Sequence, residues 1–432
     1  MRTTRCFPRS CIAPLLGIWL LLLAPASARP TELLRPSQPS NARPLADMLS
    51  TSLLEPASVQ VSLSADRIVT DAQVLAVARL VLLDSKPVVF HGVGNWFTDS
   101  GISIGRMQIR VDGIALPGNT SMLFTVAGQR HSFLVNGAEV LSAGNHTVEL
   151  VASRDAGTGS FTVQASAQLT ALVGFGDVAV VLTGSSAPIS GVSPVQVSSM
   201  SRSTTGPVYL EHAGTIQRVS GDGDAITKIY GDGGWLSEST FGINDMVSGQ
   251  DEIAPLGAHA LWAPRAGTHI FAVYTHKLDY SFNTVTYKVV PEATLLAAWG
   301  NISGNATSNV LDVPVGNASV ELGRRTFTLP AGHNGRVWVV VQGRWLDLSN
   351  SGTGGLESAI LMLDNVPVGP FAVQSFHRDM TQSQRNFSLG YLASSLSAGD
   401  HTVKVRVAPA NPADPHHNMP KFAVSASTVV LW

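Results

Sequence analysis

Cysteine is nearly absent from this chain of 432 residues, and both copies lie within its first eleven positions. Residues 1–28 have the parts of a secretory signal: arginines at the start, an apolar stretch through Leu20–Leu23, and Ala26-Ser27-Ala28 as a cleavage site. Without the signal the chain has no cysteine, so neither a disulfide nor a thiolate metal site can form. Because secreted eukaryotic domains usually contain disulfides, this composition indicates a secreted bacterial protein.

Charge is also scarce, since only 13% of the residues are charged and no run of lysine or arginine occurs. Loss of the signal removes three arginines and leaves a net charge of −5. These features exclude nucleic acid as an expected partner. No second stretch of about 20 apolar residues follows, so no transmembrane segment is expected after signal removal. We expect the mature protein in the extracellular space, at the cell surface or in the periplasm.

What the chain does have is a repeat. The pattern Ala-Gly-x-His occurs three times, each time at the start of a strand-like segment, with its histidine at positions 146, 269 and 401. The histidines are 123 and 132 residues apart, which is about the size of one domain. The repeat therefore predicts three related modules in tandem.

A second marker, Gly-x-Trp, precedes each histidine and has its tryptophan at positions 96, 235 and 345. In the first and third copies a turn follows this marker, at Asp112-Gly113 and at Asp364-Asn365. The middle copy is interpreted as lacking this turn and as having diverged between its two markers. For this reason the middle module is the one expected to have acquired a separate role.

Alternation of apolar and polar residues indicates strands that are buried on one side. After His401, the residues Val403, Val405 and Val407 share the inward face with the histidine. In the middle copy, apolar residues also occupy outward positions, at Ile270, Ala272 and Tyr274, and a neighbouring module is expected to cover that face.

Short strands joined by Gly, Asp and Asn turns, with almost no helical pattern, predict an all-β protein of three β-sandwich, jelly-roll-like modules. The expected organisation is a signal peptide over residues 1–28, a proline-rich arm or linker over 29–56, and modules over 57–174, 195–300 and 306–432.

The markers admit a structural and a functional interpretation. Each histidine, on the inward face after a glycine turn, is expected to bond a loop carbonyl rather than to form a joint site. Trp96, Trp235 and Trp345 either close the ends of the sandwich cores or, if exposed on loops, form platforms on which sugars stack.

Three other patterns resemble functional sites. Asp222, Asp224 and Asp232 lie among glycines and could wrap a calcium ion, although two Asp-Gly turns flanking one strand explain them equally well. The string Gly101-Ile-Ser-Ile-Gly105 matches the nucleophile pattern of serine hydrolases, but no helix signal follows it, so we interpret it as coincidence. The pair His416-His417 has no third metal ligand nearby.

The sequence thus favours a secreted, non-catalytic bacterial protein that acts by surface binding or assembly, as an adhesive or structural extracellular protein. Its expected partner is a second copy of itself, an extracellular glycan or another surface component. The alternative is a carbohydrate-binding protein that uses loop tryptophans, and an extracellular hydrolase is the third choice. No cofactor is expected apart from calcium.

Overall fold

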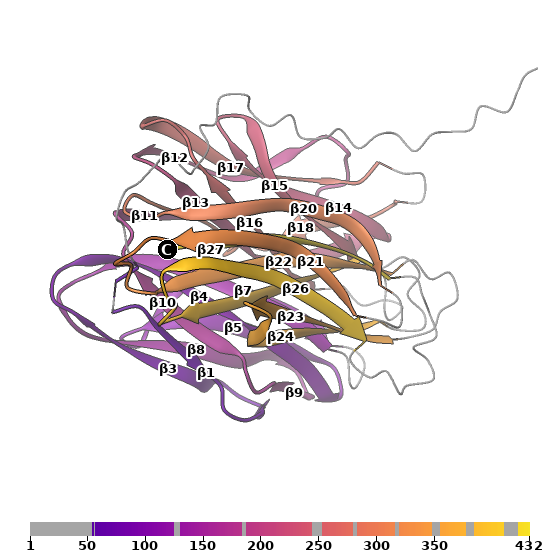
Figure 1. Cartoon of the computed structure of the whole chain (residues 1–432). Coiled ribbons are helices and arrows are strands. Elements are labelled where there is room, and N and C mark those ends of the chain that lie inside the picture. The colour runs from indigo at the N-terminus through magenta and orange to yellow at the C-terminus, as the bar shows by residue number, and fades with distance from the viewer. Residues whose placement is uncertain are drawn as a thin grey trace, which may run out of the picture. The chain divides into compact units, whose positions relative to one another are not determined.

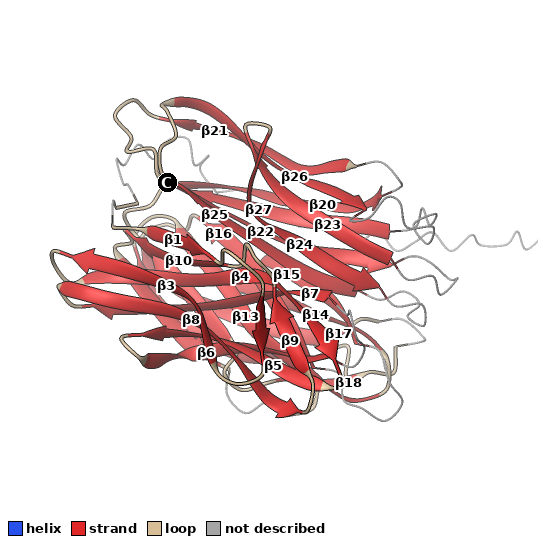
Figure 2. Cartoon of the chain, turned by 90° about the horizontal axis from the view of Figure 1, so that it is seen from below, coloured by secondary structure: helices blue, strands red, loops and turns tan. Residues whose placement is uncertain are grey.

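The computed structural model describes residues 54–55, 57–124, 130–183, 187–243, 253–279, 283–315, 319–347, 355–376, 384–409 and 422–432. The protein is all-β, and its sheets are antiparallel throughout the described ranges (Figures 1 and 2). No helix in this part of the chain has the length and apolarity that a membrane span requires. The signal peptide and all but a few residues of the proline-rich arm lie outside the described residues.

The first module has two sheets, here called its inner and outer sheets. The inner sheet contains, in spatial order, β1 (Val59–Ser62), β10 (Gln168–Val173), β4 (Lys86–Ser100) and β7 (Arg130–Leu141). It is extended by β9 (Ser160–Val163), which pairs with β4, and by β2 (Arg67–Val69), which pairs with β9. The outer sheet contains β3 (Gln73–Leu82), β8 (Gly144–Gly157), β5 (Ser103–Val111) and β6 (Ile114–Phe124).

The second module repeats this arrangement. Its inner sheet contains β11 (Asp177–Leu182), β19 (Thr294–Trp299), β13 (Val208–Ser220) and β16 (Ile253–Trp262), and β18 (Thr286–Val289) also pairs with β13. Its outer sheet contains β12 (Val195–Thr204), β17 (Gly267–Lys277), β14 (Gly223–Gly231) and β15 (Gly234–Ile243). Strand pairing thus places β11 in this module, whereas the predicted start of the module was residue 195.

The third module has the same strand order. The inner sheet contains β20 (Gly304–Val315), β27 (Phe422–Leu431), β22 (Val337–Asp347) and β25 (Gln384–Ala393). The outer sheet contains β21 (Val320–Leu329), β26 (Gly399–Pro409), β23 (Gly355–Leu363) and β24 (Val366–Phe376). Eight strands in two four-stranded sheets are the jelly-roll arrangement, which the third module has. The first module has the same eight strands with β2 and β9 added to its inner sheet, and the second has them with β18 added.

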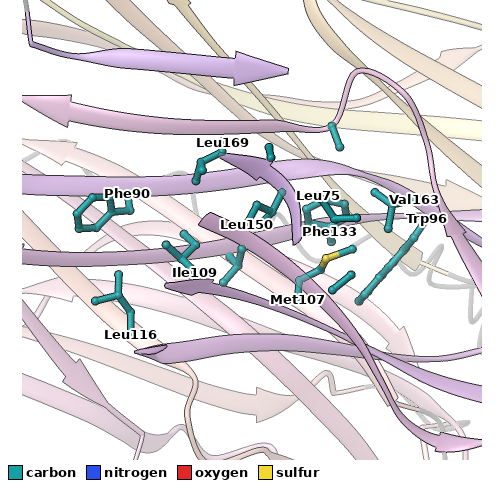
Figure 3. Close-up of a cluster of buried hydrophobic side chains, with 14 of the residues drawn as sticks. Leu75, Phe90, Trp96, Met107, Ile109, Leu116, Phe133, Leu150, Val163 and Leu169 are labelled. Carbon is teal, nitrogen blue, oxygen red and sulfur yellow. The ribbon is translucent and has the colours of Figure 1, made fainter. Parts of the chain in front are cut away.

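Side chains alternate in the outer sheets as expected for strands with one solvated face. In β5 the alternation of buried and half-buried residues is unbroken over nine positions. In β26, His401, Val403, Val405 and Val407 are all buried, which confirms the predicted inward face. Figure 3 shows the resulting core of the first module, where Met107, Phe133, Val163 and Trp96 lie together.

The inner sheets are different, because their central strands are buried on both faces. All six residues of β10 and all six of β19 are buried. One face of each inner sheet packs on its own outer sheet, and the other packs against the neighbouring modules. Leu172, Tyr209 and Trp338, one from each module, belong to a single apolar cluster.

The three modules close into a ring. One edge strand of each outer sheet packs on the inner sheet of another module: β6 on β13 and β16, β15 on β25 and β22, and β24 on β7 and β4. The first module thus packs on the second, the second on the third, and the third on the first. Such a cycle of like contacts is the arrangement of a closed heterologous ring, here formed within one chain.

The expectation for the middle module was wrong on one point. Ile270 of β17 is 56% exposed, so no neighbouring module of this chain covers it. The neighbouring modules instead cover the inner sheets, on the face that points away from the outer sheet of the same module. The sheet that contains β17 is an outer sheet. Apolar residues at outward positions of one strand therefore did not identify the interface between modules.

Candidate functional site

The histidine of each Ala-Gly-x-His turn closes a small hydrogen-bonded unit. In the first copy, Nδ1 of His146 lies 2.7 Å from Oδ2 of Asp112, and Nε2 lies 2.9 Å from the carbonyl oxygen of Ser142. The backbone N–H of Thr147 donates to Oδ1 of Asp112 at 2.7 Å. Carboxylates and carbonyls only accept, so this arrangement favours the charged imidazolium, in which both ring nitrogens donate. The hydrogen bonds with Asp112 and the carbonyl of Ser142 accordingly raise the pKa of His146.

The other two copies have the same unit. Nδ1 of His269 lies 2.7 Å from Oδ2 of Asp232, and Nδ1 of His401 lies 2.7 Å from Oδ2 of Asp364. The Nε2 atoms contact the carbonyl oxygens of Arg265 and Ser397 at 2.7 and 2.9 Å. The predicted bond to a loop carbonyl is therefore confirmed in all three modules, and every ring nitrogen has a partner.

The backbone explains why aspartate occurs at these positions. Asp112, Asp232 and Asp364 have φ values of 51°, 48° and 49°, and the residue after each also has a positive φ. Two consecutive residues with positive φ form the two-residue turn that suits a twisted hairpin, and Asp-Gly is a preferred sequence for it. The turn aims the carboxylate at the neighbouring strand, where the histidine stands.

This Asp–His pairing was not predicted from the sequence, although the signal was present. Each aspartate precedes its histidine by 34 to 37 residues in all three copies. The middle copy therefore does not lack the turn, because Asp232-Gly233 is its turn. The geometry also bears on chemistry: in each ring Nδ1 is held by the aspartate of the neighbouring hairpin turn and Nε2 by a carbonyl of the histidine's own turn. The unit is therefore a clamp between strands rather than a general base.

Replacement of Asp112 by alanine should release this clamp in one module. We expect the free energy of unfolding to fall by about 1–2 kcal/mol near pH 6, since two charge-assisted hydrogen bonds at a partly exposed site are lost. The hydrogen bond with Asp112 is the main cause that raises the pKa of His146 above its ordinary value of 6.5. In the variant this pKa should fall, which an NMR titration of the ring measures directly.

Asp84→Ala is the matched control for this prediction, because Asp84 forms only an exposed ion pair with Lys86 at 3.2 Å. It should leave the titration of His146 unchanged. A His146 pKa that stays the same in Asp112→Ala would refute the clamp.

Two of the three candidate tryptophans are core residues. Trp96 of β4 and Trp345 of β22 are 0% exposed. Trp96 packs edge-on against Phe124 and Phe161, with ring centroids 5.4 and 5.8 Å away, and Trp345 lies 4.9 Å from Phe387. A sugar-stacking role requires an exposed indole face, and neither residue offers one.

Trp235 is not the counterpart of the other two. A Cβ atom on Gly94 would meet Cβ of Ala167 at 2.6 Å, and one on Gly214 would meet Cβ of Ala293 at 2.3 Å. Gly214 of β13 is therefore the equivalent, in the second module, of Gly94 in β4 of the first. Two residues further on, Ile216 is the equivalent of Trp96. Trp235 lies instead in the edge strand β15, half-buried, three residues after Asp232.

The acidic stretch of the middle module does not converge. Asp222 and Asp224 lie at the beginning of β14 and Asp232 follows its end, so about 26 Å of extended strand separates Asp224 from Asp232. Asp232 is also bonded to His269. The three carboxylates therefore cannot hold one calcium ion together. In the described ranges, no group of three or more His, Cys, Asp or Glu side chains is arranged to bind a metal.

The remaining sequence patterns are placed as follows. Ser103, the central residue of the hydrolase-like string, is fully buried in strand β5 rather than on a strand-to-helix turn. The elbow that this chemistry needs is therefore not formed there. The pair His416-His417 lies outside the described residues.

A polar cluster that was not predicted from the sequence lies where the three inner sheets meet. Its centre is Glu211 of β13, which is 0% exposed. Its carboxylate accepts from Nε2 of His91 at 3.2 Å, from Nδ2 of Asn136 at 2.9 Å and from Nε2 of Gln342 at 3.1 Å. The first two donors belong to the first module and the third to the third module. We call these four residues, together with His259, the three-module junction.

Further aromatic and polar contacts join the modules around the junction. His259 of the second module bonds Oγ of Ser427 of the third at 2.8 Å. Trp338 of the third module packs edge-on against His91 and Tyr209, with centroids 5.1 and 5.2 Å away. Every pair of modules is therefore joined at this point by specific side chains.

The charge of Glu211 is stabilised within the junction. Burial raises the pKa of its carboxyl, but the ring of His91 and the donor from Asn136 outweigh this effect, so the pKa lies below the ordinary value. A buried carboxylate that is met by donors from two other modules fixes how the modules pack, because any other register would leave the charge without partners.

Comparison with known proteins adds little. No protein-family model matches the chain. No curated protein matches it either. Among solved structures, it is similar to PNGF-II, at 9% identity over 77% of this chain and 98% of that chain, with a TM-score of 0.28.

Two further solved structures show the range of similarity. One is the N-terminal CBM22-1–CBM22-2 tandem domain of Xyn10C from Paenibacillus barcinonensis, at 10% identity over 59% of this chain and 91% of that chain, with a TM-score of 0.17. The other is the VP2 subviral particle of infectious bursal disease virus, at 9% identity over 90% of this chain and 83% of that chain, with a TM-score of 0.20. At these scores the similarities support no functional argument.

Proposed function

We propose that this chain is a secreted, non-catalytic bacterial protein that acts outside the cytoplasm by surface binding or assembly. The observation that carries the proposal is the closed ring of modules around the three-module junction. The ring packs three small domains against one another, and each module keeps the outward face of its outer sheet for contacts with a partner.

The surface of the outer sheets and their turns fits this role. The chain has few charges, and large apolar side chains stand exposed there: Val77, Val81, Ile114, Ile270 and Val366. Exposed apolar groups on a weakly charged surface favour contact with another copy or with a surface component.

The proposal is tested by expressing the whole chain in a bacterial host. We expect export with cleavage after Ala28, so that N-terminal sequencing begins at Arg29. The purified mature chain should then either self-associate in sedimentation velocity or co-sediment with isolated cell envelopes of the producing cells. Retention of the uncleaved chain in the cytoplasm, or a mature chain that is monomeric and stays out of the envelope pellet, would overturn the proposal.

A further inference from the structure

The outer sheet of the second module carries a cluster of aromatic side chains on its outward face. Trp235 of β15 is paired with Tyr230 of β14, and Tyr274 of β17 lies diagonally across from Tyr230. The rings of Tyr230 and Tyr274 are 5.0 Å apart and inclined by 70°. All three side chains are half-buried, so each keeps part of its surface in contact with solvent. Figure 1 labels β12, β17, β14 and β15, the strands of this sheet.

Polar side chains form a second row beside these rings. Directly opposed residues place Glu238, Lys228, Tyr274 and Gln196 in line across the four strands β15, β14, β17 and β12. The hydroxyl of Tyr274 donates to Oε1 of Gln196 at 2.8 Å. Opposed residues on one face of a sheet are close neighbours, so this row adjoins the aromatic one.

The charges of the cluster compensate one another. Nζ of Lys228 lies 3.6 Å from Oε2 of Glu238 and 5.0 Å from the centroid of the Trp235 ring. The surface therefore has donors and acceptors but no net charge between these two groups, which favours a neutral ligand over an anion or a cation.

The other two modules do not have this cluster. The residues two before the turn aspartates of the first and third modules are Arg110 and Met362, where the second has Tyr230. The places of Trp235 are taken by Ala115 and Pro367, and those of Tyr274 by Val151 and Arg406. Strand pairing confirms the correspondence, since Arg110 pairs with Ala115 and Met362 with Pro367, as Tyr230 pairs with Trp235. Only the middle module has aromatic side chains at all three places.

We propose that this face, formed by Trp235, Tyr230 and Tyr274 with Gln196, Lys228 and Glu238, binds a neutral oligosaccharide. Aromatic rings pack against the C–H faces of sugars, while amide, carboxylate and ammonium groups bond sugar hydroxyls, and this face offers both kinds of group side by side. The inference rests on the proposed function and names the partner of one surface. It places sugar contact on a sheet face rather than on loop tryptophans.

The test is isothermal titration calorimetry of the mature chain with cellohexaose, xylohexaose and chitohexaose. At least one of these probes should bind. Trp235→Ala, Tyr230→Met and Tyr274→Val introduce the residues that the other modules use at these places, so the fold should tolerate them. Each variant should weaken binding by about tenfold, because one stacked ring is lost.

Matched controls come from the other outer sheets. Arg110→Ala and Arg406→Ala change the corresponding places in the first and third modules and should leave the affinity unchanged. All variants are first compared with the wild type by circular dichroism and thermal midpoint, which separates loss of binding from loss of folding.

Two results would overturn the inference. One is the absence of binding to all three hexasaccharides by a mature chain that co-sediments with envelopes or self-associates, a result that leaves the proposed function in place. The other is a binding constant that the three aromatic substitutions do not change. Failure of export or of surface association would instead count against the proposed function itself.

Discussion

Replacement of Glu211 by alanine should lower the free energy of unfolding of the mature chain by about 3–5 kcal/mol, the cost of breaking a buried charged cluster. The substitution leaves the donors of His91, Asn136 and Gln342 buried without their common acceptor. It also leaves a cavity where the three inner sheets meet. Chemical denaturation followed by far-UV circular dichroism measures the change.

Two comparison variants make this prediction specific. Glu211→Gln keeps one acceptor oxygen and should cost less than alanine. Glu321→Ala removes a half-exposed carboxylate of the third module, which forms an ion pair with Nζ of Lys404 at 2.6 Å. This surface change should cost no more than about 1 kcal/mol. The proposed role of the junction would be contradicted if Glu211→Ala lowered the free energy of unfolding no more than Glu321→Ala does.

The second prediction concerns acid. His212 and His259 lie in the inner sheet of the second module, and burial lowers the pKa of each ring to about 4. His259 faces Glu211 and His91, and His212 donates from Nδ1 to the carbonyl of Thr294 at 2.7 Å. Their folded pKa values lie below the ordinary 6.5, so the unfolded chain binds protons first and stability falls as the pH drops from 6.5 towards 4.

The expected loss is about 3 kcal/mol for each of these histidines by pH 4, from a pKa difference of about 2.5. The lowered pKa of Glu211 acts in the same direction. Its contribution to the free energy of unfolding is lost as the pH falls through the pKa that the carboxyl has in the folded chain. The clamp histidines act in a different window. Their raised pKa values add stability as the pH falls to 6.5, and that gain is complete below it.

Stability should therefore be greatest near pH 6.5 and should decline steeply on the acid side. Denaturation midpoints measured across the pH range give the profile. His212→Gln and His259→Gln remove one titrating group each and should flatten the acid limb. A profile that stays level between pH 6.5 and 4, or variants that leave the acid limb as steep as before, would refute this assignment.

Much of the fold could be predicted from the sequence because it depends on local pattern. The alternation after His401 and the turn before it were sufficient to place that histidine inside a strand and to give it a carbonyl partner. The number of modules followed from the recurrence of the same turn. These features are decided by residues close together in the chain, so one sequence is enough to find them.

What the sequence did not reveal depends on distant contacts. The junction joins His91, Glu211 and Gln342, which are more than 100 residues apart from one to the next, and no local pattern connects them. The available signal was the pair of runs Leu169–Val173, apolar except for Thr170, and Leu295–Trp299, because a strand without alternation is buried on both faces.

The error over Trp235 has a physical cause as well. The string Gly-Gly-Trp matched the marker locally, while the true counterpart, Gly214-x-Ile216, has lost its tryptophan. What persists there is the glycine, since Ala293 lies too close to admit a side chain. The counterpart is identified by its glycine, which allows two strands to lie close together, and not by its tryptophan. The tryptophan that was misassigned instead belongs to the aromatic surface of the outer sheet.

The central claim is that the three jelly rolls form one body locked at the three-module junction, and differential scanning calorimetry of the mature chain tests it most directly. We predict a single cooperative transition in which the calorimetric and van't Hoff enthalpies agree. In Glu211→Ala the transition should move to lower temperature or split. A wild-type profile that resolves into three independent transitions, with midpoints unaffected by Glu211→Ala, would contradict the claim.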